Sequence, residues 1–122
     1  MAAIACLSGV LLVAPGIATP ARGAEHLTSF ARCLTRKGAT LYGATWCPTC
    51  EAQLRLFGDA ADDLDYVECS LRGTGFETPE CEQADVHSFP TWEFHDGSRH
   101  AGLMSLSRLS RQTGCPLPEA TP

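Results

Sequence analysis

Two cysteines separated by two residues are the side chains best suited to chemistry in this sequence. Cys47 and Cys50 stand in the segment Trp-Cys-Pro-Thr-Cys, where a thiolate could attack a disulfide and the pair could close a disulfide between themselves. Residues 39–45 form an apolar run typical of a strand, and residues 51–57 form a run typical of a helix. The pair is therefore expected where a strand leads into a helix.

The start of that helix decides which sulfur is the nucleophile. Pro48 suits the first helical position, because its fixed φ fits a helix and its missing N–H is not needed there. Cys47 then faces unpaired N–H groups and the positive end of the helix dipole, which favour its thiolate. Cys50 lies one turn further along the same face and could resolve a mixed disulfide formed at Cys47.

Composition and charge limit the classes of protein and partner. The chain has 122 residues, of which 44% are hydrophobic and 19% charged, as expected for one globular domain. The net charge is −5 and no cluster of Lys or Arg occurs, which argues against binding nucleic acid or anionic lipid through a basic patch. We expect a monomer with neutral or basic partners.

The N-terminal segment predicts export. Residues 1–18 are almost wholly apolar or small, but this run is short for a bilayer span and contains Pro15 and Gly16. Residues 1–23 are therefore predicted to be a signal peptide cleaved before Ala24, leaving a domain at 24–122 in the periplasm or outside the cell. Because no Lys or Arg precedes the apolar part, an uncleaved membrane anchor or a start further upstream stays open.

The number of cysteines fits an exported chain. Of the seven, Cys6 falls in the predicted signal, which leaves an even number for the mature chain. Cys69 and Cys81 flank the loop at residues 70–80, and a disulfide between them would close it. Cys33 and Cys115 then remain as a second pair, although either could instead be a small buried apolar residue.

The remaining chain alternates between helical and strand patterns. Trp92 and Phe94 alternate with Glu93 and are expected in the core. Strands are predicted at residues 39–45, 64–69, 90–94 and 98–101, and helices at 25–37, from the cysteines to about 62 with a break at Gly58, at 78–85 and at 105–113. This order predicts an α/β fold with a central mixed sheet of about four strands flanked by helices.

These motifs together resemble the thioredoxin fold. The Trp-Cys-x-x-Cys segment follows a strand, and Phe89-Pro90-Thr91 follows further along the chain, as in that fold. The resemblance implies that the Phe89–Pro90 peptide is cis and lies against the dithiol. It also implies that the Phe89 backbone pairs with an extended substrate, while Trp46 and Pro90 form the surface around the cysteines.

The likeness is closer to one branch. Matching runs occur at residues 42–50, 56–58, 66–69, 78–81 and 89–92, and they resemble the periplasmic thioredoxin-like domain fused to bacterial homologues of vitamin K epoxide reductase. In that branch the domain receives disulfides from a quinone-linked membrane oxidase and passes them to secreted proteins. The resemblance covers roughly residues 27–114 and implies a free-standing relative with a membrane redox partner of this type.

Two departures bear on the direction of electron flow. Thr49 stands where the branch usually has His, which removes one group that could stabilise a thiolate. Leu41 stands where cytosolic thioredoxins have a buried Asp that handles the proton of the second thiol. Without that carboxylate, an oxidase or isomerase is favoured over a reductase, unless water or Glu51 takes its role.

The sequence thus predicts a thiol-disulfide oxidoreductase acting on protein thiols and disulfides, with no organic cofactor or metal. The alternatives are a periplasmic thiol reductase fed by a membrane electron donor, and a redox-inert module that holds extended peptides. The intact Cys47 and Cys50 argue against the inert module. A metal site has no support from ligand spacing, although the chain contains His26, His87, His95 and His100. Of these, His87 is interpreted as either a rim residue of the active surface or an ordinary exposed loop residue.

Overall fold

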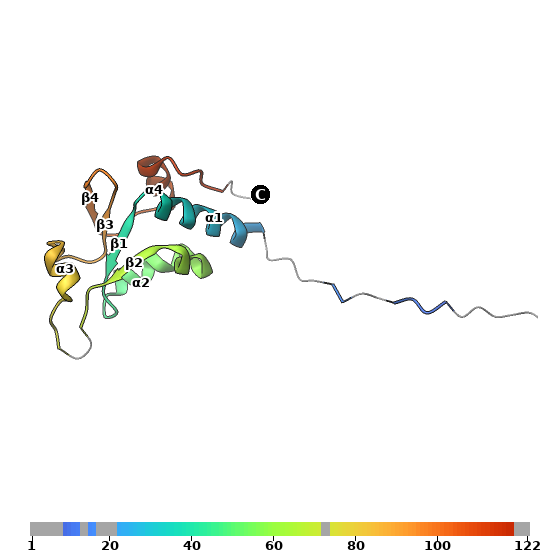
Figure 1. The fold of residues 1–122 in the computed structure, drawn as a ribbon, viewed down its shortest axis with the longest axis horizontal. Helices are drawn as coiled ribbons and strands as arrows, with labels where there is room; N and C mark the ends of the chain where they lie inside the picture. The colour runs from blue at the N-terminus through green and yellow to red at the C-terminus, as the bar shows by residue number, and fades with distance from the viewer. Residues whose placement is uncertain (1–8, 13–14, 17–21, 72–73, 119–122) are drawn as a thin grey trace, which may run out of the picture.

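The structure, a computed structural model, describes residues 9–12, 15–16, 22–71 and 74–118. The elements in these ranges are α1 (Arg22–Arg36), β1 (Thr40–Gly43), α2 (Pro48–Arg55), the 3-10 helix η1 (Gly58–Asp63), β2 (Asp65–Glu68), α3 (Pro79–Gln83), β3 (Thr91–Glu93), β4 (Arg99–Ala101) and α4 (Leu106–Thr113) (Figure 1). The predicted signal peptide lies largely outside the described residues, and its predicted cleavage site falls in the first turn of α1. Among the helices described, none has the length and apolar character needed to cross a bilayer.

A mixed sheet lies at the centre of the molecule. In the described ranges it has four strands in the order β2-β1-β3-β4, with β1 parallel to β2 and antiparallel to β3 (Figure 1). β4 pairs antiparallel with β3 and completes the predicted hairpin. The α/β class and the mixed four-stranded sheet are confirmed. Because β1 and β2 are parallel, their carboxyl ends meet at one edge of the sheet, directly before the dithiol.

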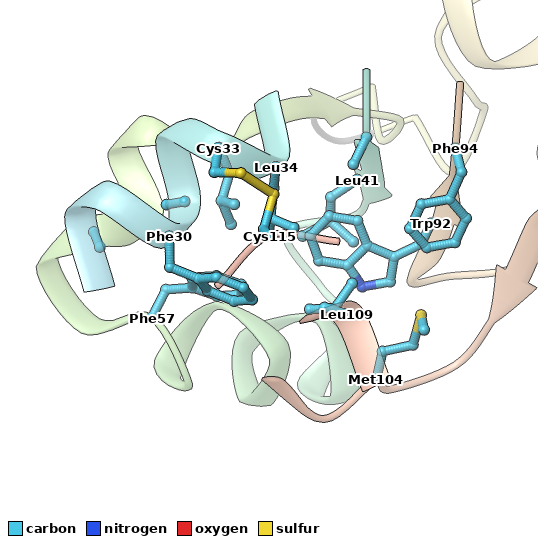
Figure 2. Close-up of a cluster of buried hydrophobic side chains, with 14 residues drawn as sticks. Phe30, Cys33, Leu34, Leu41, Phe57, Trp92, Phe94, Met104, Leu109 and Cys115 are labelled. Atoms are coloured by element: carbon cyan, nitrogen blue, oxygen red, sulfur yellow. A yellow bond between two sulfur atoms is a disulfide. The ribbon is translucent and has the colours of Figure 1, made fainter. Parts of the chain in front are cut away.

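One face of the sheet carries the larger hydrophobic core. Register places Leu41 beside Trp92, and both side chains are buried beneath α1, η1 and α4. Figure 2 shows Phe30 of α1 stacked on Phe57, with ring centroids 6.1 Å apart. Each fully buried side chain of this size contributes about 1.5–3 kcal/mol from burial. This face therefore supplies much of the stability of the domain.

The cysteine helix is shorter than predicted. α2 ends at Arg55, and the chain continues from Gly58 as the 3-10 helix η1 instead of reaching residue 62 as one helix. Gly58 has φ +54°, a left-handed conformation that interrupts an α-helix and that glycine adopts at low cost. The break suggested at Gly58 is thus confirmed, and it lets Phe57 and Ala60 pack into the core.

A buried glutamine joins three parts of the core. Gln53 of α2 is fully buried, and its Oε1 accepts hydrogen bonds from Trp92 Nε1 (3.1 Å) and from the Met104 N–H (2.7 Å). Its Nε2 donates to the Met104 carbonyl at 3.0 Å. Because each of these buried groups has a partner, the amide fixes α2 against β3 and the segment before α4.

The opposite face of the sheet carries a smaller cluster. Tyr42 and Val86 pack there with Cys69 and Cys81, under α3. Thr78 caps α3 by accepting a bond from the Cys81 N–H, and Pro79 is the first helical residue.

Among the described residues, two disulfides tie elements together. Cys69 and Cys81 close the loop that leads into α3, with Cα atoms 5.5 Å apart. Cys33 of α1 is joined to Cys115 beyond α4, with Cα atoms 5.8 Å apart (Figure 2). These are the two pairings that the cysteine count suggests.

Candidate active site

The start of α2 holds Cys47 in the predicted place. Cys47 is the N-cap, with extended backbone angles of φ −94° and ψ 110°, and Pro48 is the first helical residue. Its sulfur accepts a hydrogen bond from the Cys50 N–H at 3.1 Å. A donor in this position stabilises negative charge on the sulfur, so the local structure suits a thiolate nucleophile at Cys47.

The two sulfurs have different surroundings. Both cysteines are free thiols, with 5% of Cys47 and 2% of Cys50 exposed. Burial, followed by the contact with Cys47, raises the pKa of the Cys50 thiol to about 12. Cys50 therefore keeps its proton at neutral pH, as suits the second cysteine of an exchange reaction.

The loop before β3 lies against the dithiol. The Phe89–Pro90 peptide is cis, as the resemblance implies, and Phe89 packs against the small cluster of Ala44, Cys47 and Cys50. The Cys47 thiol donates to the Phe89 carbonyl across 3.7 Å. Pro90, however, is buried rather than part of the surface, and its carbonyl accepts a bond from the Gly102 N–H. Phe89 and Trp46 thus provide the accessible surface near the cysteines.

A groove opens beside Trp46 and Phe89, and neither Cys47 nor Cys50 is among its lining residues. Trp46 is 68% exposed and meets the Phe89 ring edge to face, with centroids 6.0 Å apart. Phe76, 72% exposed, lies in the wall formed by the disulfide-closed loop. The groove has a volume of about 320 Å³, and its lining comprises Trp46, Cys69, Ser70, Gly75, Phe76, Glu77, His87, Ser88 and Phe89.

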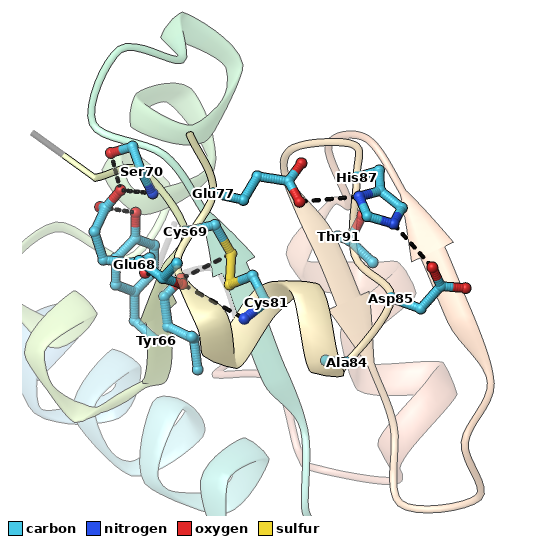
Figure 3. Close-up of a disulfide and its surroundings, with 12 residues drawn as sticks. Tyr66, Glu68, Cys69, Ser70, Glu77, Cys81, Ala84, Asp85, His87 and Thr91 are labelled. Carbon is cyan, nitrogen blue, oxygen red and sulfur yellow. Dashed lines mark hydrogen bonds and ion pairs between the residues drawn. A yellow bond between two sulfur atoms is a disulfide. The ribbon is translucent and has the colours of Figure 1, made fainter. Parts of the chain in front are cut away.

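His87 lies on the rim of this groove. Its Nδ1 is 2.9 Å from Glu77 and its Nε2 is 2.8 Å from Asp85, so one imidazole joins the closed loop to the end of α3 (Figure 3). The hydrogen bonds to Asp85 and Glu77 raise the pKa of His87. His87 is exposed and borders the groove, so it has features of both interpretations drawn from the sequence, a rim residue and an exposed loop residue. Within the described ranges, no group of three His, Cys, Asp or Glu side chains is arranged to hold a metal ion.

Sequence reasoning missed the carboxylate that approaches the site. Leu41 is buried in the core, and Glu51 is a surface residue 3.9 Å from Arg55. Glu68, at the end of β2, instead accepts a bond from the Thr45 N–H at 3.0 Å, two residues before Cys47. The available signal was the parallel pairing of β1 and β2, which brings the last residue of β2 next to the turn that follows β1.

The fold and the site define a thioredoxin-like domain with a dithiol at the start of a helix and a cis-proline loop against it. No protein-family model matches the chain. Over an alignment of 101 residues, the chain is 38% identical to the thiol-disulfide oxidoreductase LTO1 of Arabidopsis thaliana. The alignment covers 80% of this chain and 25% of the relative. The chain thus spans about a quarter of the length of that relative. The chain therefore has a thioredoxin-like fold and is similar, over four fifths of its length, to a protein named thiol-disulfide oxidoreductase.

Proposed function

We propose that this protein is a thiol-disulfide oxidoreductase that passes disulfides to other proteins through Cys47 and Cys50, as an oxidase or isomerase. The observation that carries the proposal is the geometry of Cys47. Its sulfur accepts a backbone N–H at the start of α2 and contacts the carbonyl of the cis-proline loop, while Cys50 holds a proton behind it. The similarity to a protein named thiol-disulfide oxidoreductase supports the same chemistry.

The reaction is two successive exchanges. A substrate thiolate attacks Cys47 of the Cys47–Cys50 disulfide, the intramolecular S–S bond breaks, and Cys50 leaves and takes up a proton. A second thiolate of the substrate then attacks the substrate sulfur of the mixed disulfide, the bond to Cys47 breaks, and Cys47 leaves as a thiolate. Two electrons move from the substrate to the protein, and the products are a substrate disulfide and the reduced pair.

The groove supplies the substrate surface in this proposal. Trp46 and Phe76 offer exposed aromatic rings in the same groove as the half-buried Phe89, which suits apolar side chains of an extended chain. Pro90, next to Phe89 in the chain, is buried. Binding of this kind needs no cofactor.

The proposed location is the periplasm or the exterior of the cell. Disulfides such as Cys33–Cys115 and Cys69–Cys81 persist in oxidising compartments, and the N-terminal sequence pattern is typical of an export signal. There the reduced pair would be oxidised again by a membrane oxidase of the vitamin K epoxide reductase type. Leu41, in place of a buried carboxylate, supports flow in the oxidising direction.

The test is a transfer assay with the full chain. Oxidised protein is mixed with reduced, unfolded ribonuclease A, and thiol loss and regained ribonuclease activity are followed. Wild type should transfer one disulfide per molecule. Cys47→Ser and Cys50→Ser should both transfer none, because neither can form the donor disulfide. When mixed with scrambled, disulfide-containing ribonuclease A, Cys50→Ser should accumulate a mixed disulfide through Cys47, whereas Cys47→Ser should not. If wild type transfers nothing, or if Cys47→Ser equals wild type, the proposal is overturned in favour of a binding module.

A further inference from the structure

The turn that carries Cys47 is tied to β2 by one carboxylate. Glu68 Oε1 accepts bonds from the Thr45 N–H and the Ser70 N–H, both at 3.0 Å, and from the Ser70 hydroxyl. Its Oε2 accepts a bond from the Tyr66 hydroxyl at 2.9 Å (Figure 3). The Thr45 and Ser70 hydroxyls are also 3.0 Å apart. Both oxygens of Glu68 are therefore engaged, and the turn before the dithiol has a fixed partner.

Gly43 shows how closely this cluster approaches the end of β1. Gly43 and Glu68 are register partners, and the Cys69 N–H donates to the Gly43 carbonyl at 2.8 Å. A Cβ at Gly43 would lie 2.7 Å from the Tyr66 hydroxyl oxygen, a distance that side-chain carbons do not adopt. Glycine here leaves the space through which Tyr66 reaches Glu68.

At neutral pH the cluster contains one anion, Glu68, and one neutral phenol, Tyr66. Burial disfavours ionisation of Glu68, but hydrogen bonds from Ser70, Tyr66 and Thr45 outweigh it and lower the pKa of this carboxyl. Burial, and then the bond to Glu68, raise the pKa of Tyr66, which stays a phenol and a donor. Glu68 is therefore an anion at neutral pH. Its charge adds to burial and to Cys47 in raising the pKa of Cys50.

We propose that Glu68, supported by Tyr66 and Ser70, is the positioning residue of the dithiol; this rests on the function proposed above. It fixes the turn at Thr45 that presents Cys47, and it places a permanent negative charge near Cys50. That charge disfavours the Cys50 thiolate and so slows the step in which Cys50 attacks a mixed disulfide at Cys47. Glu68 of β2 thus places a carboxylate near the dithiol, whereas the β1 position that carries an Asp in cytosolic thioredoxins is Leu41 here.

Glu68→Gln separates the two roles, because the amide keeps the shape of the side chain and removes its charge. After reduced protein reacts with oxidised glutathione at pH 7, the rate at which Cys50 resolves the Cys47–glutathione mixed disulfide should rise about threefold, because this attack needs the Cys50 thiolate. Glu68→Ala should show the same direction of change and also a lower Tm, because the turn loses its partner. Tyr66→Phe keeps the charge and should change the rate less than Glu68→Gln.

Glu93→Gln is the matched control. Glu93 is also a strand carboxylate in a half-buried position, but its partner is Arg99 at 2.6 Å. Its substitution should leave the rate of mixed-disulfide resolution unchanged. The proposal is overturned if folded Glu68→Gln matches wild type, or if Glu93→Gln raises the rate equally. A wild type without any reversible Cys47/Cys50 transition would instead refute the function itself and this inference with it.

Discussion

One face of the sheet packs against α1, η1 and α4, whereas the other packs against α3 and a disulfide-closed loop. On the first face Phe30 stacks on Phe57, and Trp92 lies tilted against Phe57. The disulfide of this face joins positions 82 residues apart. The second face has a smaller cluster, and its disulfide spans 12 residues. The groove borders the closed loop of the second face. The larger core that stabilises the fold and the groove proposed to contact substrate therefore lie on different faces of the sheet.

The dithiol connects these two sides. α2, which begins at Cys47, is anchored to the large core by Gln53. Phe89 packs against the cluster that contains the two cysteines and also against the smaller cluster of the second face. The side with the larger core therefore holds the nucleophile in place, while the other side borders the groove proposed to contact a partner. Changes on the two sides should then affect different measurements.

The disulfides should show the largest difference in stability. In the chain-entropy relation, loops of 82 and 12 residues correspond to about 4.5 and about 3 kcal/mol. Removing Cys33–Cys115 by double Ala substitution should therefore cost more free energy of unfolding than removing Cys69–Cys81. Urea unfolding without reductant measures both. The reverse order would show that the small side, not the large core, limits stability.

Gln53→Ala should destabilise the protein by about 3 kcal/mol, because the Trp92 N–H and both backbone groups of Met104 lose their buried partner. Gln83→Ala, on the exposed end of α3, is the control and should change the free energy of unfolding little. Both are measured by urea unfolding. An equal loss in both variants would contradict the role given to Gln53.

Phe76→Ala should slow disulfide transfer to an unfolded protein about fivefold, because the groove loses an exposed aromatic wall. The reaction with glutathione, which is too small to need that wall, should keep its rate. Leu103→Ala removes another exposed apolar side chain away from the groove and should change neither rate. A Phe76→Ala variant with the wild-type rate on protein substrates would remove the closed loop from the proposed substrate surface.

The smallest effect concerns His87. Its raised pKa means that the ion pairs with Asp85 and Glu77 stabilise the folded state fully below the ordinary value of 6.5. This contribution is lost as pH rises through the raised pKa. The Tm difference between wild type and His87→Asn should therefore shrink from pH 6 to pH 9. A difference that grows with pH would contradict this assignment.

The sequence predicts what depends on local pattern. The stripe of Leu27, Phe30 and Leu34 predicts α1, and Cys47 with Pro48 predicts the start of α2. Such signals need only helical spacing and capping chemistry, which are read within one turn.

The features that the sequence did not predict depend on contacts with residues distant in the chain. Gln53 and Glu68 lie in segments whose pattern indicates only a helix and a strand, because their hydrogen-bond partners are set by packing and parallel register. The burial of Pro90 likewise follows from its place beneath the Phe89 loop and beside Gly102, which no local pattern specifies.

The most direct test of the central claim is the reduction potential of Cys47/Cys50. Full-length protein is equilibrated across a glutathione series, the free thiols are alkylated, and mass spectrometry locates the label on these two cysteines. We expect one reversible two-electron transition well above about −200 mV, as for disulfide donors and isomerases. A value near or below about −270 mV would contradict the oxidising role and identify a reductant.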